Sequence, residues 1–248
     1  SVGLFATCLV DLIRPEIGFS AASLIADAGF EVQVPKSQTC CGQPQFNNGD
    51  LAGTRKLARH FLNTFESFDY VVVPSGSCAA TVKIHYPEVL AGDLTHVSRA
   101  AEMTAKTYEL TEFLTEVADY QIVAEYSATC TYHDSCSGYR ELGIRTQPRM
   151  LLDQVEGLKM TECNESSACC GFGGTFCVKY PQISARIAAE KAENVERSGA
   201  DTLLGGDLGC LMNIAGTLRR RGSQIQVRHV AEVLAGLGNA PAIGQPQK

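Results

Sequence analysis

Eleven cysteines stand out in this chain of 248 residues, which has no tryptophan. Two pairs are adjacent in sequence and each precedes a glycine, in Cys40-Cys41-Gly42 and Cys169-Cys170-Gly171. Neighbouring cysteines reach disulfide geometry only through a strained ring. Thiolates placed side by side are instead suited to zinc or to iron–sulfur ligation. The pairs therefore predict a metal or redox centre, with a vicinal disulfide as the alternative.

Four cysteines recur in the same order in the second half of the chain. Cys8 precedes the first pair and Cys78 follows it, while Cys136 and Cys210 flank the second pair. Counterparts are separated by 128, 129, 129 and 132 residues. A repeat of this regularity predicts two copies of one unit. The expected ligands are Cys8, Cys40, Cys41 and Cys78 in the first half and Cys136, Cys169, Cys170 and Cys210 in the second.

The segments between the cysteines repeat as well. Short apolar runs predict strands at residues 3–8, 31–34 and 70–73, and at 131–136, 158–161 and 202–204. Helices are expected at 15–29, 50–65, 148–155 and 181–198. Each half closes on similar sequence, at 108–114 and 228–234, and residues 88–106 are an insertion in the first half. Strands alternating with helices predict an α/β fold of two Rossmann-like parallel-sheet domains, at residues 1–122 and 123–248.

This architecture predicts where the cysteines lie. Ligands of open α/β sheets bind beyond the carboxyl ends of the strands. The four cysteines of one half can converge there, and helix N-termini at that edge would stabilise thiolates. The glycine after each pair permits a tight backbone that a Cβ would obstruct. The alternative is that these cysteines are ordinary buried thiols.

Six segments carry a family resemblance. The chain resembles the cysteine-rich CCG-domain family, whose members include a component of heterodisulfide reductase and iron–sulfur components of glycolate and glycerol-3-phosphate dehydrogenases. It is most similar to the lactate utilisation protein A family of short proteins with two CCG domains. The segments are Phe5-Ala6-Thr7-Cys8-Leu9-Val10-Asp11, Thr39-Cys40-Cys41-Gly42-Gln43-Pro44, Pro74-Ser75-Gly76-Ser77-Cys78, Tyr132-His133-Asp134-Ser135-Cys136, residues 169–176 and residues 206–213.

The resemblance implies iron–sulfur ligation and a part in oxidising L-lactate to pyruvate. It also implies partner subunits of the same system, including a second iron–sulfur protein. The broader family ends each domain with Cys-x-x-Cys, whose five thiolates hold a non-cubane cluster. Ser75 and Asp207 replace the first of those two cysteines here. Four thiolates suit a [4Fe–4S] cluster, so two such clusters are expected, with Ser75 or Asp207 as a labile oxygen ligand in the alternative.

Other residues have weaker signals. His133 is the candidate catalytic residue, because a histidine near a cluster tunes its potential or moves a proton; the alternative is a structural imidazole bonded to a carbonyl. Arg14 either binds a carboxylate through its guanidinium or, as favoured here, is a charged residue on the surface. Cys130 and Cys163 are expected to be core or surface thiols. Cys177 is also expected to be a core or surface thiol, with an extra ligand or a redox thiol as the alternative.

Composition excludes several functions. The net charge of −6 with no basic block argues against nucleic acid as a partner. No apolar run approaches the ~20 residues of a membrane span, and the first residues lack signal-peptide character, so a cytoplasmic location is expected. The glycines at 171–174 do not form a dinucleotide fingerprint, and no flavin motif is present.

The residues and the resemblance together favour an iron–sulfur electron-transfer subunit that acts as part of an oxidoreductase with partner proteins. Because clusters pass single electrons, the hydride acceptor for lactate must lie elsewhere. Two alternatives stay open. One is a heterodisulfide-reductase-like enzyme that attacks a disulfide, and the other is a zinc-bound interaction module.

Overall fold

Two four-stranded sheets form the centre of the computed structural model, which describes residues 1–245. Their strand orders are β2-β1-β3-β4 and β6-β5-β7-β8, and all paired strands are parallel. The same order in both sheets confirms the predicted α/β class and the repeat. The sheets lie on either side of the predicted boundary at 122/123, and the last three residues of the predicted second domain lie outside the described residues.

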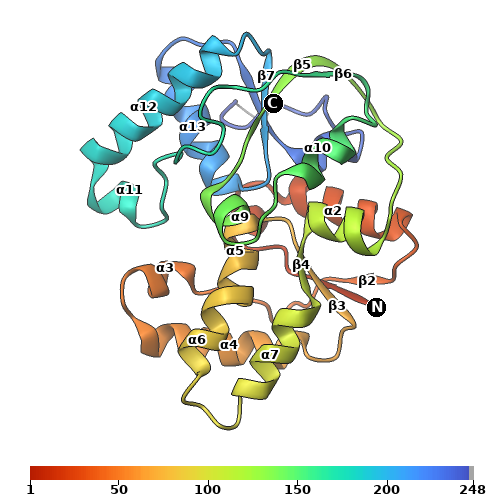
Figure 1. Cartoon of the computed structure of the whole chain (residues 1–248), viewed down its shortest axis with the longest axis vertical. Helices are drawn as coiled ribbons and strands as arrows, with labels where there is room; N and C mark the ends of the chain where they lie inside the picture. Colours follow the sequence, from red (N-terminus) through yellow and green to blue (C-terminus); the bar gives the residue numbers. More distant parts are fainter. Residues whose placement is uncertain (246–248) are drawn as a thin grey trace.

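The first half lies in the lower part of Figure 1, in red to yellow-green. Its elements are β1 (Val2–Leu4), α1 (Cys8–Ile13), α2 (Pro15–Asp27), β2 (Val32–Gln33), α3 (Gln43–Asn47), α4 (Leu51–Phe65), β3 (Tyr70–Val73), α5 (Gly76–Ala80), η1 (Thr81–His85), α6 (Tyr86–Leu90), α7 (Val97–Lys106), β4 (Thr107–Glu109), α8 (Leu110–Glu112) and η2 (Phe113–Val117), where η denotes a π-helical turn.

The second half lies above it, in green to blue. Its elements are β5 (Glu125–His133), α9 (Cys136–Arg140), α10 (Thr146–Leu152), β6 (Glu156–Met160), α11 (Phe176–Lys179), α12 (Pro181–Arg197), β7 (Thr202–Gly205), α13 (Leu208–Arg220), β8 (Gln226–His229) and α14 (Val230–Leu234).

The predicted elements are present, with shifted ends. β3 has the predicted bounds, whereas β1 ends at Leu4 and β5 ends at His133, before the cysteines that were expected to continue these strands. Cys8 and Cys136 instead begin helices α1 and α9. The free N–H groups of a first helical turn favour negative charge, and those of Leu9 and Ser137 lower the pKa of the two thiols, although the net pKa of each thiol is raised by its surroundings.

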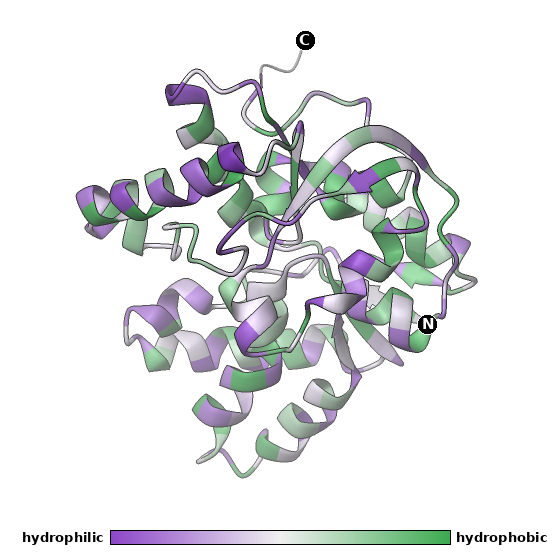
Figure 2. Cartoon of the chain, turned by 45° about the horizontal axis from the view of Figure 1, so that its top comes forward, coloured by the Kyte–Doolittle hydropathy of each residue, from purple (hydrophilic) through white to green (hydrophobic). Residues whose placement is uncertain are grey.

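One hydrophobic cluster connects the two sheets. It contains Val2 and Leu4 of β1 together with Leu203 and Leu204 of β7, all of them buried. The helices around it are amphipathic, as Figure 2 shows for α12 at the left, where purple and green faces alternate. Each helix therefore buries its apolar stripe against a sheet. Although the fold repeats, its two copies share this cluster, and a second cluster lies wholly in the first half.

Two short helices meet where the halves join. Figure 1 shows α5 and α9 together at the centre of the molecule. A Cβ built on Gly76 would lie 3.0 Å from the Cα of Gly138, so the backbones of the two helices touch. Only glycine permits this approach. The spacing of the halves at this point is therefore set by the main chain.

A buried ion pair joins the halves at another place. Arg14, just before α2, donates from Nε to Glu232 Oε1 of α14 at 2.8 Å, and its Nη2 donates to the carbonyl of Pro241 at 2.6 Å. The two side chains are 7 % and 0 % exposed. The expected surface position of Arg14 is therefore wrong. The guanidinium does bind a carboxylate, but this carboxylate is that of Glu232 in the same chain.

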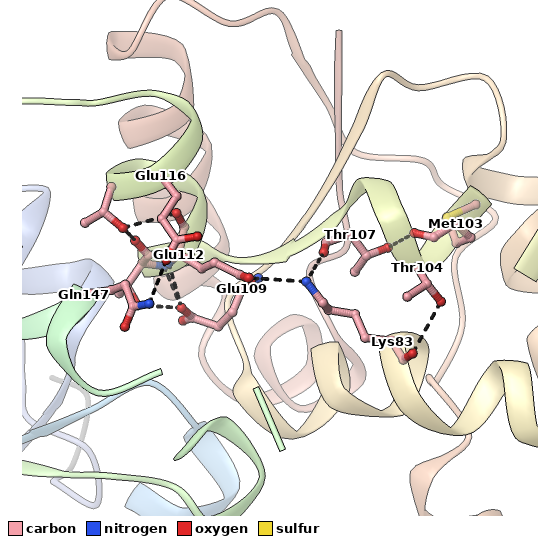
Figure 3. A network of polar contacts seen from close by, with 10 residues as sticks. Lys83, Met103, Thr104, Thr107, Glu109, Glu112, Glu116 and Gln147 are labelled. Carbon is pink, nitrogen blue, oxygen red and sulfur yellow. Dashed lines mark hydrogen bonds and ion pairs between the residues drawn. The ribbon is translucent and has the colours of Figure 1, made fainter. Parts of the chain in front are cut away.

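The closing segments of the halves have equivalent structures. Glu109 follows β4 and caps α8, accepting from the N–H of Thr111 at 2.7 Å and of Glu112 at 3.2 Å. His229 ends β8 and caps α14, accepting on Nδ1 from the N–H of Ala231 at 3.2 Å. Figure 3 shows the Glu109 cap, where Lys83 also donates to the Thr107 carbonyl at 3.0 Å. The similarity predicted for residues 108–114 and 228–234 thus corresponds to two matching caps.

Among the residues described, no helix has the length and apolar character that crossing a membrane requires.

Candidate metal centre

A single cavity of about 380 Å³ lies between the halves and is lined by all eight cysteines of the predicted ligand sets. The repeat predicted two groups of four. It did not predict that both groups face the same space. The cysteines of the cavity are Cys8, Cys40, Cys41, Cys78, Cys136, Cys169, Cys170 and Cys210.

In the first half, three separate segments bring the sulfurs together. Cys8 starts α1, Cys78 lies in α5, and the adjacent pair lies in the loop between β2 and α3. Cys41 Sγ lies 3.5 Å from Cys78 Sγ, and the Gly42 N–H donates to Cys40 Sγ at 3.4 Å. The hydroxyl of Tyr86 donates to the Cys41 carbonyl at 2.8 Å and so fixes the loop from behind.

The second half uses the same arrangement. Its adjacent pair lies in the loop between β6 and α11, where the N–H groups of Gly171 and Phe172 donate to Cys169 Sγ at 3.3 Å and to Cys170 Sγ at 3.4 Å. The amide of Asn213 in α13 donates to the Cys170 carbonyl at 2.8 Å, in the role that Tyr86 has in the first half. Both pairs are thus held by their own loop and by one polar side chain.

The glycine after each pair has the backbone that was predicted for it. Gly42 and Gly171 have φ values of 88° and 82°, in the left-handed region that side chains disfavour. A Cβ on Gly171 would lie 2.7 Å from the carbonyl oxygen of Ser184, and one on Gly42 would lie 3.3 Å from Leu57. Each cysteine pair can turn into the cavity because the residue after it, Gly42 or Gly171, has no side chain.

The thiols of the cavity change one another's pKa values, and hydrogen bonds from Cys41 and Cys8 lower that of Cys40 to about 3. The pKa of Cys8 and that of Cys41 are raised, first because each thiol hydrogen-bonds to Cys40, and burial adds to this effect. Burial raises the pKa of Cys136, and a hydrogen bond with Cys170 raises that of Cys169. Gathered thiols resist losing several protons together, because the thiolates would repel one another. A bound soft metal ion offsets this repulsion.

Among residues 1–245, no lysine or arginine lines the cavity. Its ionisable side chains, apart from the cysteines, are His85, Glu141 and Asp207. The donor set is therefore sulfur-rich and lacks the cations that would hold an anionic organic ligand. These residues are compatible with iron–sulfur ligation, because eight cysteine sulfurs line one cavity and cysteine thiolates are the usual ligands of such clusters.

Ser75 and Asp207 bond to each other across the boundary between the halves. The Ser75 hydroxyl donates to Asp207 Oδ1 at 3.1 Å, and Ser77 donates to the same carboxylate from its N–H at 2.8 Å and its hydroxyl at 2.9 Å. Asp207 is 6 % exposed, and burial raises its pKa. The residues that stand in place of two cysteines thus connect the halves.

His133 lies against the second group of cysteines. One ring nitrogen and the sulfurs of Cys170 and Cys210 all lie within 4.8 Å of one another. The side chain is buried, and burial lowers its pKa to about 3, so the ring is neutral. Neither ring nitrogen has a partner in hydrogen-bond geometry among the described residues.

The three remaining cysteines do not line the cavity. Cys130 is buried in β5 and Cys163 is buried in the loop that follows β6. Cys177 lies in α11 and its thiol donates to the carbonyl of Gly174 at 3.1 Å. All eleven cysteines are free thiols in the described residues.

Residues at the edge of the cavity had no signal in the sequence. His85 stacks on Phe46 with ring centroids 4.1 Å apart, and both follow from packing between η1 and α3. Asn48, after α3, donates to Thr175 Oγ1 at 2.9 Å and accepts a hydrogen bond from Lys179 of α11. The helices that follow the two cysteine loops therefore bridge the halves, a contact that no local pattern could indicate.

Comparison with known proteins agrees with this arrangement. The family model described as "Cysteine-rich domain" (CCG) matches residues 2–83 and 130–215. The chain is 46 % identical over 234 residues to lactate utilization protein A of Geobacillus, covering 94 % of this chain and 98 % of the relative. It is 45 % identical over 238 residues to the protein of that name from Shouchella clausii, with the same coverage.

A solved structure shares the fold. A hypothetical protein from Helicobacter pylori superposes with a TM-score of 0.66 at 11 % identity, over 96 % of this chain and 49 % of that one. At this identity the similarity concerns the architecture alone.

Proposed function

Because the chain belongs to the lactate utilization protein A family of cysteine-rich CCG-domain proteins, we propose that it is an electron-transfer subunit in the oxidation of L-lactate to pyruvate. The single observation that carries the proposal is the cavity lined by eight cysteines in two matching groups. We propose that each group holds one [4Fe–4S] cluster, and that the chain works with partner subunits, including a second iron–sulfur protein.

Each cluster, when bound, supplies one-electron chemistry. The protein's contribution is to hold and shield it. Cys8, Cys40, Cys41 and Cys78 form the first ligand set, and Cys136, Cys169, Cys170 and Cys210 form the second. The N–H groups that follow each adjacent pair donate to the sulfurs, at 3.3–3.4 Å, and stabilise their negative charge.

The charge of the cavity supports electron transfer over binding of lactate. A 2-hydroxy acid is an anion, and proteins commonly hold such a carboxylate with arginine or lysine. The residues lining the cavity include neither, and Asp207 and Glu141 would repel an anion. Arg14, the candidate fork, is occupied by Glu232. We therefore propose that lactate and the acceptor of its hydride bind on another subunit.

The Ser75–Asp207 contact supports four-thiolate ligation over an oxygen ligand. Asp207 accepts three hydrogen bonds from Ser75 and Ser77, and a carboxylate used in this way is a poor additional ligand. It also weakens the heterodisulfide-reductase-like alternative, since the fifth ligand of that chemistry has no counterpart here.

Iron and sulfide analysis of anaerobically purified protein tests the proposal. We expect about four irons per half and a brown protein whose EPR spectrum after reduction shows [4Fe–4S] signals. A colourless protein that contains zinc would contradict the proposal and favour the interaction module. Dithionite-reduced protein that cleaves a mixed disulfide without partners would favour the thiol–disulfide enzyme.

A further inference from the structure

The two ligand sets have different surroundings, and the difference lies at equivalent positions. Phe5 and His133 are each the third residue before the first cysteine of their half. Strand pairing confirms the match. Leu4, the residue before Phe5, pairs with Val72, and Tyr132, the residue before His133, pairs with Leu204. An aromatic hydrocarbon in the first half thus corresponds to an imidazole in the second.

A second exchange accompanies the first. The buried positions of α4 and α12 match at a constant spacing of 130 residues: Thr54, Ala58, Phe61, Leu62 and Phe65 correspond to Ser184, Ala188, Lys191, Ala192 and Val195. Phe61 therefore corresponds to Lys191. In the first half Phe5 and Phe61 pack edge to face, with ring centroids 5.0 Å apart. In the second half the corresponding pair is His133 and Lys191.

The second pair is polar and buried beside the sulfurs. Lys191 is 1 % exposed and donates to the carbonyls of Glu165 at 2.9 Å and Ser166 at 2.7 Å. Burial lowers the pKa of Lys191, and the negative charge of Cys170 and Cys210 as thiolates opposes this shift. The ring of His133 lies close to the Ser166 carbonyl, which already accepts from Lys191 and from the N–H of Asp134, and the imidazole faces the two sulfurs without another partner.

Burying an unpaired imidazole and an ammonium in a protein core is costly. Both costs are offset if a negatively charged group occupies the neighbouring site. The first half has no such requirement, because its phenylalanines are satisfied by packing alone. The polar pair is therefore matched to the charge of the second centre.

We propose that the second centre has the higher reduction potential of the two, because His133 directs a ring nitrogen at its cysteine sulfurs and Lys191 places a positive charge beside them. This inference rests on the proposed function. Hydrogen bonds to cluster sulfurs and less negative surroundings favour the reduced, more negative state. Phe5 and Phe61 give the first centre neither effect. One electron that is given to the protein leaves the first centre oxidised and resides on the second.

Redox titration followed by EPR tests this order. Two variants isolate the centres, Cys170→Ala leaving the first and Cys41→Ala leaving the second. We expect a higher potential in Cys41→Ala. In the wild-type protein, one electron per molecule from dithionite is expected to give the signal of the second centre. Equal potentials, or the reverse order, would overturn the inference.

The pair itself is tested by making the second half resemble the first. We expect His133→Phe and Lys191→Met each to lower the potential of the second centre and to leave the first unchanged. His133→Asn, which keeps an N–H donor, is expected to retain part of the effect. Where His133→Phe does not fold, Lys191→Met and His133→Asn decide the matter alone. A shift of both centres together, or of neither, would refute the assignment.

The two proposals fail differently. If the purified protein contains no iron, the proposed function fails and the inference fails with it. If it contains both clusters and their potentials are the same, only the inference is overturned.

Discussion

The two halves of the molecule have the same sheet order and the same four cysteines but different interiors. Each has a parallel sheet in the order 2-1-3-4, a Cys-Cys-Gly loop and a capped closing helix. Behind the ligands, Phe5 and Phe61 of the first half correspond to His133 and Lys191 of the second. The comparison shows that the four cysteines recur in both copies, whereas the side chains behind them differ and would give the two proposed centres different surroundings.

The largest expected effect comes from removing one ligand in each half. Cys41→Ala and Cys170→Ala are each expected to lose about half of the iron and of the visible absorption, because each cysteine belongs to one set of four. Iron analysis and absorbance of anaerobic samples measure this. Cys177→Ser, which changes a thiol outside the cavity, is the control and is expected to keep the full content. Complete loss in either ligand variant would show that the halves do not load independently.

The next effect concerns the contact between the halves. Arg14→Leu leaves Glu232 buried without its partner, which typically costs about 3–5 kcal/mol. The free energy of unfolding in urea is expected to fall by that amount. Arg186→Leu breaks an exposed pair with Glu190, whose loss costs about 1 kcal/mol or less. Similar losses in the two variants would mean that the buried pair contributes little to joining the halves.

The two caps are expected to respond to pH in opposite directions. Burial raises the pKa of Glu109 from 4.5 to about 7, so the folded state holds its proton more tightly and stability falls as pH rises through this range. Burial lowers the pKa of His229 from 6.5 to about 4, so the unfolded chain binds the proton more tightly and stability falls as pH drops through that range. Each effect is at most about 3 kcal/mol.

Melting temperatures measured across pH separate the two caps. Glu109→Gln is expected to flatten the decline from about pH 4.5 to 7 and to leave the acid side unchanged. His229→Asn is expected to flatten the decline from about pH 6.5 to 4 and to leave the other side unchanged. Identical profiles for both variants and the wild type would show that neither cap titrates in these ranges.

The smallest expected effect is a difference in stability between the alanine variants of Gly42 and Gly171, the glycines of the two cysteine loops. An alanine at a positive φ costs about 1–2 kcal/mol of stability, and this cost applies to the alanine variants of both Gly42 and Gly171. Gly29→Ala measures this cost by itself, because a Cβ at Gly29 meets nothing within 4 Å. Gly171→Ala also pushes against the Ser184 carbonyl, whereas the tightest contact of Gly42→Ala is with the end of the Leu57 side chain, at 3.3 Å. We expect Gly171→Ala to be the less stable, by about 1 kcal/mol or more. Equal stabilities would show that the Ser184 backbone adjusts.

The repeat and the fold class followed from local patterns that survive in the sequence. The strand at 70–73 is an uninterrupted apolar run, and the helices after Pro15 and Pro181 carry the proline that marks a first turn. β1 and β5 were placed too far along the chain, because the residues before Cys8 and Cys136 look extended although the helices begin at the cysteines. The ends of these strands depend on the helices that follow.

What joins the halves could not be predicted from one sequence. Arg14 and Glu232 are 218 residues apart, and nothing near either residue indicates the other. The same holds for Ser75 and Asp207, which looked like lost ligands and are hydrogen-bonded partners. The common cavity is a consequence of these distant contacts. The local pattern therefore contains the two cysteine sets, and tertiary packing determines that they face the same cavity.

The hydrophobic cluster that spans both sheets has a consequence for folding. Val2 and Leu4 of β1 belong to the same buried cluster as Leu203 and Leu204 of β7, while a second buried cluster, which contains Phe61 and Phe65, lies wholly in the first half. A core shared by two repeats couples their unfolding, whereas a core inside one repeat can retain structure by itself. We therefore expect loss of packing in the shared cluster to destabilise both copies, and loss of packing in the second cluster to act first on the first half.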